Sequence, residues 1–260
     1  MIEFYKESGL TPLEFINNIK KEYPDKKICY TARLDPMARG LVPVLFNEEC
    51  KNMHMYTKLS KTYEVKVIFG YKTDSDDALG ILENINNINN INTYSNIINY
   101  QEIISKYKKL FVIDNELIIN QKFHYFSTKT ILSRHKNNKN IDNIDNINNS
   151  NDYYHNVKLF SSKIIDSGEL NFTEWVNECC KIINKVDKSK DFRQKEIIEQ
   201  WQSLALCKPI TIKPIKYITL QLHVGSGFFV RQFIRDISDK IGIPLMCYDI
   251  HRTSIDYELF

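Results

Sequence analysis

The chain has 260 residues, of which 43% are hydrophobic and 12% aromatic, and its formal net charge is +3. This composition excludes a disordered chain and provides enough residues for a sizeable core, in one large domain or two small ones. Because the net charge is weak, binding to nucleic acid would need a local basic face.

The N-terminal residues MIEFYKESG contain no apolar signal segment, and no run of the chain is long enough to span a membrane. We therefore expect a soluble intracellular protein, located in the cytoplasm. The first predicted element is a helix over residues 12–22. Thr11 and Glu14 form a capping box around Pro12, and apolar residues follow at helical spacing.

Alternating apolar and polar residues predict strands over residues 61–70 and 218–224. After Gly225 and Gly227 the spacing becomes helical over residues 229–241. A further strand is predicted over residues 245–254.

Two stretches, at about residues 84–99 and 137–151, are repeats of Asn, Ile and Asp with Ile at every third position. This period fits neither a helix nor a pleated strand, so we interpret them as low-complexity loop insertions within one domain. Helical patterns follow around residues 175–183 and 192–201.

The cysteines and histidines show no metal-binding pattern. None of the six cysteines forms a C-x-x-C pair, which favours reduced thiols, and the six histidines are scattered. The acidic stretch over residues 73–80 lacks the spacing of a calcium loop, so we read it as a turn with Asx hydrogen bonds after a strand. We expect no metal and no cofactor.

Asp35 is the first candidate for chemistry. Pro36 biases Asp35 toward an extended backbone, and nearby arginines would keep its carboxylate ionised. Such a carboxylate can act as a nucleophile. A turn aspartate beside a salt bridge would look the same in sequence.

Two further residues are candidates. Arg231 follows the glycine turn and could pair bidentately with a carboxylate from elsewhere in the fold, although a surface helix residue is also compatible. Tyr63 opens a strand, where it is either a core aromatic or a group that meets a ligand.

Several stretches, in chain order, resemble the motifs of the TruB family of tRNA pseudouridine synthases. TARLDPMARGLVPV resembles the family pattern G-H-x-G-T-L-D-P-x-A-x-G-x-L, and GSGFFVRQFIRDISDKIG resembles S-x-G-x-Y-I-R-x-L-x-x-D-L-G-x-x-L-G. KTYEVKVIFGYKTDSDDALG is similar to K-x-Y…x-x-G-x-x-T-D-T-x-D-x-x-G, YDIHRTSI to L-R-R-T-x-x-G, KESGLTPLEFINNIK to K-P-x-G-x-T-S and YFSTKT to Y-S-A-x-K. The resemblance spans residues 6–254 apart from the insertions and residues 157–210.

The resemblance implies a role for each site residue. Asp35 is the catalytic aspartate, Arg231 its ion-pair partner, and Tyr63 stacks on the target base and helps to move a proton. The substrate-binding residues that it implies are Tyr30, Arg33, Lys61, Phe229, Ile250 and Arg252. The chain departs from the family pattern at Tyr30, where the family has His, and at Phe229, where it has Tyr.

The resemblance also implies the fold and the partners. We expect one α+β catalytic domain over residues 1–260, with a mixed, mostly antiparallel sheet, flanking helices and a central RNA-binding cleft. We expect no C-terminal PUA domain, no guide RNA and a monomer that acts on the T-arm of tRNA.

The implied reaction isomerises uridine 55 to pseudouridine after the base is extruded from the stack, and it needs no cofactor. Two alternatives stay open. One is a non-catalytic RNA-binding or RNA-folding protein on the same fold. The other is a nucleoside hydrolase with a carboxylate nucleophile, whose second carboxylate would come from the Asp74–Asp77 cluster.

Overall fold

The computed structural model describes residues 1–83, 100–126, 154–206 and 214–257. The two predicted insertions, at 84–99 and 137–151, lie outside the described residues, as does most of YFSTKT. The described helices are α1 (Pro12–Glu22), η1 (Asn47–Asn52), α2 (Met53–Thr57), α4 (Tyr100–Lys106), α5 (Lys108–Phe111), α7 (Phe172–Ile183), α8 (Gln194–Leu206) and α9 (Val230–Ile241). The strands are β1 (Ile2–Lys6), β2 (Ile28–Tyr30), β3 (Ala38–Phe46), β4 (Lys61–Phe69), β5 (Leu117–Lys122), β6 (Tyr154–Leu170), β7 (Ile215–Val224) and β8 (Leu245–Ile255).

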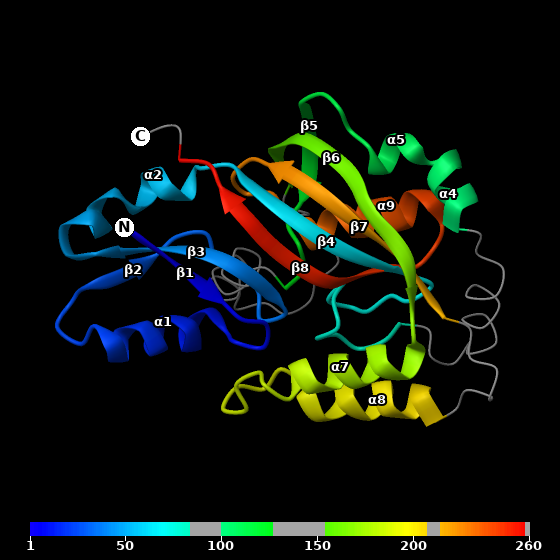
Figure 1. The fold of residues 1–260 in the computed structure, drawn as a ribbon, viewed down its shortest axis with the longest axis horizontal. Coiled ribbons are helices and arrows are strands. Elements are labelled where there is room, and N and C mark those ends of the chain that lie inside the picture. The colour runs from blue at the N-terminus through cyan, green and yellow to red at the C-terminus, as the bar shows by residue number, and fades with distance from the viewer. Residues whose placement is uncertain (84–99, 127–153, 207–213, 258–260) are drawn as a thin grey trace, which may run out of the picture.

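The described strands form one eight-stranded sheet in the order β1-β3-β8-β4-β7-β6-β5, with β2 paired to β3. Every pairing is antiparallel except that of β3 with β8. Figure 1 shows β8, β4, β7 and β6 running side by side across the molecule. The predicted fold class, a mixed and mostly antiparallel sheet with flanking helices, is confirmed.

The elements predicted from periodicity lie where the sequence placed them. The helix over 12–22 is α1, and its capping box is formed, with Thr11 Oγ1 accepting from the Glu14 backbone N–H. The predicted strands are β4, β7 and β8, and the predicted helices are α7, α8 and α9. Strands β1, β2, β3, β5 and β6 were not predicted.

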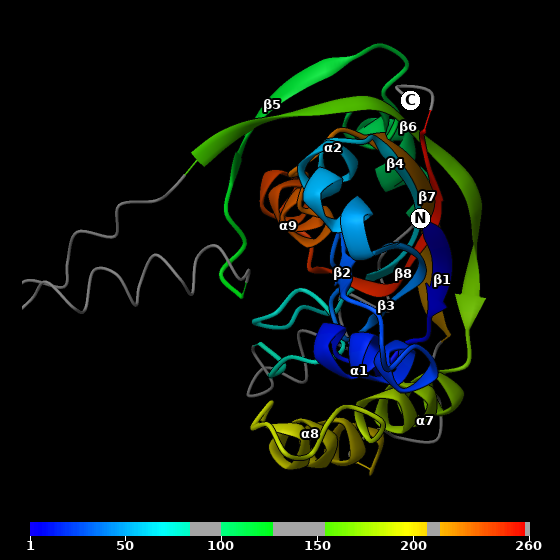
Figure 2. The same cartoon turned by 90° about the vertical axis from the view of Figure 1, so that its left-hand side faces the viewer.

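The buried apolar side chains of the helices and the sheet form two separate clusters. The first cluster joins the apolar stripe of α9, including Phe233 and Ile237, to the β4 side chains Val65 and Val67. The second cluster holds α7 and α8 together around Trp175 and Trp201. Figure 2 shows α9 against one face of the sheet, with α7 and α8 paired beyond its lower edge. This packing brings the N-terminal turn of α9 to the loops that follow β2 and β4.

No helix among the described residues is both long enough and apolar enough to cross a membrane.

Candidate active site

The loop that carries Asp35 is held by backbone contacts and by a buried lysine. Its turn is closed by a hydrogen bond from the Ala38 N–H to the Asp35 carbonyl, at 3.0 Å. Lys6 Nζ donates to the carbonyl oxygens of Asp35 (3.1 Å) and Ala38 (2.7 Å). Burial lowers the pKa of Lys6 to about 8. Strand β1 therefore fixes the backbone from which the Asp35 side chain projects.

Arg231 contacts Asp35 as the resemblance implied. Arg231 Nη2 lies 2.7 Å from Asp35 Oδ2, and the side chains are 9% and 48% exposed. A buried guanidinium thus orients a carboxylate that solvent and a ligand can reach. Because Arg231 is in the first turn of α9, the packing of α9 on the sheet decides where this charge lies.

Asp77 is the second carboxylate partner of Arg231, and the sequence did not reveal it as one. Arg231 Nη1 lies 3.1 Å from Asp77 Oδ2 and donates to the Ser75 carbonyl at 2.9 Å. Asp77 Oδ1 accepts from Ser75 Oγ (2.8 Å) and from the Leu79 N–H (2.9 Å). The predicted turn with Asx hydrogen bonds is confirmed. The last aspartate of the T-D-T-x-D pattern was the available signal for this contact.

The charges in this cluster stabilise one another. Burial lowers the pKa of Arg231, but Asp35 and Asp77 raise it by more, so that the net shift is upward. Burial raises the pKa of Asp77, while Arg231 and the Ser75 hydroxyl oppose this shift. The guanidinium is therefore always charged, and it opposes the rise that burial causes in the pKa of Asp77.

Tyr63 lies on β4 between Leu222 of β7 and Arg252 of β8, and it is 8% exposed. Arg252 Nη1 lies 3.5 Å from the phenol oxygen, and Arg252 Nε donates to the Leu41 carbonyl at 2.6 Å. Arg252 is fully buried, and its Nη2 has no partner among the described residues. The buried Arg252 guanidinium thus contacts the phenol oxygen of Tyr63 from the interior of the protein.

Lys61 is also buried, and its Nζ donates to the carbonyl oxygens of Leu59 and Thr57. Burial and the charge of Arg252 lower the pKa of Lys61 to about 8. The ammonium therefore faces backbone carbonyls rather than solvent. Lys61 is therefore better placed to hold the first residues of β4 than to contact RNA directly.

Phe229 immediately precedes α9 and is half-buried. Its backbone N–H donates to Gln121 Oε1 (2.8 Å), and Gln121 Nε2 donates to its carbonyl (2.9 Å). The ring packs edge-on against Phe123 and His155. The end of β5, the residue that follows it and the start of β6 thus fix Phe229, through contacts that the sequence did not predict.

The remaining predicted binding residues differ in how deeply they are buried. Ile250 is buried in the first cluster, and Tyr30 is half-buried with the Arg33 guanidinium 5.8 Å from its ring centre. Arg33 is exposed. Arg39, another arginine near Asp35, instead forms an ion pair with Asp249 at 2.8 Å.

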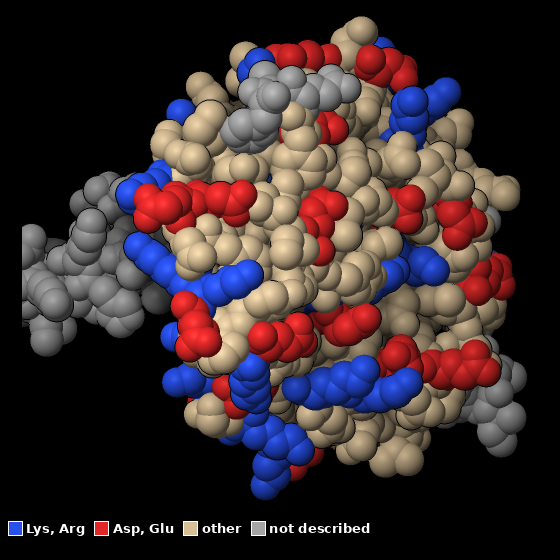
Figure 3. Space-filling view, turned by 60° about the vertical axis from the view of Figure 1, so that its left-hand side comes forward, with Lys and Arg blue, Asp and Glu red and all other residues tan. Residues whose placement is uncertain are grey.

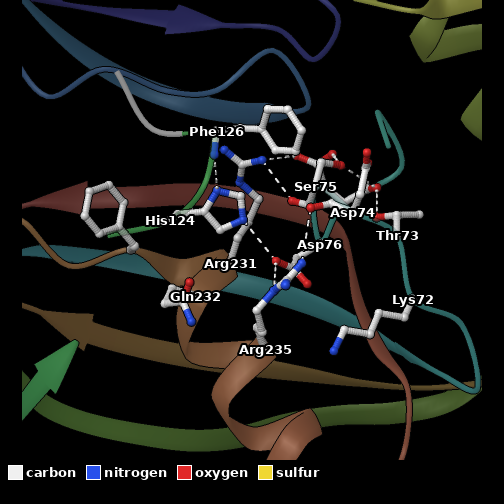
Figure 4. Close-up of polar contacts among 12 residues, drawn as sticks. Lys72, Thr73, Asp74, Ser75, Asp76, His124, Phe126, Arg231, Gln232 and Arg235 are labelled. Atoms are coloured by element: carbon white, nitrogen blue, oxygen red, sulfur yellow. Dashed lines mark hydrogen bonds and ion pairs between the residues drawn. The ribbon is translucent and has the colours of Figure 1, made fainter. Parts of the chain in front are cut away.

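The three aspartates of the turn each have a basic partner. Asp74 pairs with Arg193 at 2.6 Å, and Asp76 lies 2.6 Å from Arg235 Nε. Figure 4 shows Asp74, Asp76 and Arg235 beside Arg231. The second carboxylate that the nucleoside-hydrolase alternative requires would therefore have to be one of these ion-paired aspartates.

Among the described residues, no group of three or more His, Cys, Asp and Glu side chains is arranged to hold a metal ion. Four basic side chains are exposed at the end of α1 and in the turn that follows it: Lys20, Lys21, Lys26 and Lys27. In Figure 3, Lys and Arg side chains gather mainly in the lower half of the face shown, with Asp and Glu between them. The surface is thus locally basic rather than uniformly so.

Known proteins match both the sequence and the fold. Residues 20–117 match the family model described as "TruB family pseudouridylate synthase (N terminal domain)". This match agrees, for this segment, with the resemblance that its motifs predicted.

Curated relatives match over about a third of their length. The tRNA pseudouridine synthase B of Blochmanniella floridana is 35% identical over 83 residues, which are 32% of this chain and 32% of that protein. The protein of the same name from Campylobacter jejuni subsp. jejuni serotype O:23/36 (strain 81-176) is 34% identical over 103 residues, 39% of this chain and 36% of the relative.

Two solved structures share the fold over 98% of this chain, each with a TM-score of 0.51 and 13% identity. Their titles are "Structure of H/ACA RNP bound to a substrate RNA containing 2'-deoxyuridine" and "Crystal Structure of a Cbf5-Nop10-Gar1 Complex", and the match covers 46% and 48% of those chains. At this identity the likeness establishes the architecture alone.

Proposed function

We propose that the chain is a pseudouridine synthase that isomerises uridine in tRNA, with the T-loop uridine 55 as its target. The observation that carries the proposal is the ion pair between the buried Arg231 and the half-exposed Asp35, which lies in the segment that matches the TruB family model. The curated relatives are named tRNA pseudouridine synthase B, which supports tRNA as the substrate.

The reaction breaks the N1–C1′ bond, forms the C5–C1′ bond and moves a proton from C5 to N1, so atoms and electrons balance without a co-reactant. Asp35 is the nucleophile, or the base that assists cleavage. Arg231 keeps its carboxylate ionised and oriented until the base enters.

Tyr63 and Phe229 hold the extruded uracil in this proposal. Stacking of a base on an aromatic ring contributes about 1–3 kcal/mol, enough to offset the cost of roughly a few kcal/mol for extruding it. Arg252 touches the Tyr63 phenol, so Tyr63 is also the group best placed to move the C5 proton.

The experiment incubates the purified chain with an unmodified tRNA transcript and maps pseudouridine by position. We expect pseudouridine at position 55, and none with the Asp35→Asn variant. A wild-type chain that binds the transcript but forms no pseudouridine would favour the alternative of a non-catalytic RNA-binding protein.

A further inference from the structure

Asp76 has a strained backbone conformation and lies between Ser75 and Asp77, the two residues that contact Arg231. Its backbone φ is +58°, a left-handed conformation that is unfavourable for a residue with a side chain. This reversal lets the carbonyl of Ser75 and the carboxylate of Asp77 both face the same guanidinium. The geometry of the Arg231 contact therefore depends on the conformation of Asp76.

Side chains from two other elements hold Asp76 in this conformation. Asp76 Oδ2 lies 3.0 Å from His124 Nε2 and 2.6 Å from Arg235 Nε, and the aspartate is fully buried. Arg235 also donates to the Asp74 carbonyl at 3.1 Å. Arg235 follows Arg231 by one helical turn, so both guanidinium groups project from one face of α9 toward the loop. Figure 4 shows the two arginines and His124 converging there.

His124 contacts Asp76 through its Nε2. Its Nδ1 accepts a hydrogen bond from the Phe126 N–H at 3.3 Å, which assigns the ring proton to Nε2 and directs that proton at Asp76. His124 is 1% exposed. It lies three residues after Gln121, whose amide holds Phe229. One short segment thus contacts both ends of the candidate site.

We propose that His124, Asp76 and Arg235 are positioning residues that hold Arg231, and through it Asp35, in the geometry that the chemical step requires. This inference rests on the proposed function and extends it to three residues that the family motifs leave unassigned. Their loss slows isomerisation while RNA binding persists, because His124 and Asp76 are buried and Arg235 contacts the Asp74–Asp76 loop.

The test compares His124→Leu with His124→Gln, whose side-chain nitrogen can still donate to Asp76. We expect His124→Leu to lower the single-turnover rate at saturating protein by about 10-fold or more and to change the RNA dissociation constant by less than about threefold. His124→Gln should return the rate to within about threefold of the wild type. Ile19→Ala, in the first apolar cluster, is the control for lost stability, because Ile19 is buried in a cluster that contains no residue of the loop over 73–82.

A second measurement does not depend on activity. The Leu79 and Ile81 amides donate to Asp77 and Asp74, so their hydrogen exchange reports whether the loop is held. Exchange at both should rise about 10-fold in His124→Leu and fall again in His124→Gln. Unchanged exchange in His124→Leu would contradict the proposed support.

The outcomes separate the two proposals. A wild-type chain without isomerase activity refutes the proposed function, whereas an active wild type with an equally active His124→Leu refutes the positioning role. Equal slowing by Ile19→Ala, at a matched melting temperature, also refutes it. Should His124→Leu fail to fold, the more exposed Arg235→Gln replaces it, and a wild-type rate in that variant overturns the inference.

Discussion

Arg231 Nη2 lies 2.7 Å from Asp35 Oδ2 and joins a residue that is almost buried to one that is half-exposed. The cation is fixed by Asp77 and the Ser75 carbonyl on its inner side. Its outer side orients a carboxylate that a substrate can still reach. The first two predictions test these two roles of Arg231, the orientation of Asp35 and the pairing with Asp77.

Asp35→Asn should abolish turnover while RNA affinity stays within about threefold, because the change removes charge and nucleophilicity but little volume. Single-turnover rates with a binding curve measure both quantities. Asp249→Asn is the matched control, since Asp249 is also paired with an arginine, but with Arg39 rather than with Arg231. Retention of a tenth of the wild-type rate by Asp35→Asn would exclude Asp35 as the essential group.

Arg231→Met should lower the free energy of unfolding by about 3–5 kcal/mol, because it leaves the buried Asp77 carboxylate without its cation. Adding Asp77→Asn should recover at least about 1 kcal/mol, since the neutral amide no longer needs that partner. Urea unfolding of the two single variants and the double variant measures this coupling. Strictly additive losses would contradict a direct interaction.

Tyr63→Phe should retain RNA affinity, because the ring that stacks remains, but slow the chemical step by about 10²-fold. Phe229 has no hydroxyl, so phenol chemistry at this site falls to Tyr63. Tyr63→Leu should lose both affinity and rate. A wild-type rate in Tyr63→Phe would reduce Tyr63 to a stacking platform and would assign the proton transfer to Asp35 or water.

Lys61 should make stability rise with pH in the alkaline range. Burial and Arg252 lower its pKa from 10.5 to about 8 in the folded chain. Between these values the unfolded chain binds the proton and the folded chain does not, so the free energy of unfolding increases with pH. This contribution is absent below about pH 8 and complete above pH 10.5.

The measurement compares the wild type with Lys61→Met at several pH values, so that titrating tyrosines and cysteines cancel. The difference in free energy of unfolding should shift in favour of the wild type by up to about 3 kcal/mol between pH 8 and pH 10.5. A difference that is independent of pH would mean that Lys61 keeps an ordinary pKa.

Local patterns predicted much of the secondary structure. The capping box begins α1, and strict alternation identified β4 because its Glu64 and Lys66 face away from the core. Strand β3 was not predicted because residues 42–45 are all buried, so its sequence does not alternate between apolar and polar residues. Strand β6 was not predicted because its 17 residues are mostly polar or half-exposed. Its pairing with β5 and β7 holds it in the sheet.

By itself the sequence determined the residues that carry the proposed chemistry, because Asp35, Tyr63 and Arg231 stand in motifs whose spacing is a local property of the chain. Only the tertiary structure decided their partners. The pairing of Arg231 with Asp77, and the contact of Asp76 with His124, depend on how α9 and the segment after β5 pack beside the loop that follows β4. Such contacts join residues far apart in the chain, and burial alone makes their charges interact strongly, so no local pattern in the sequence encodes them.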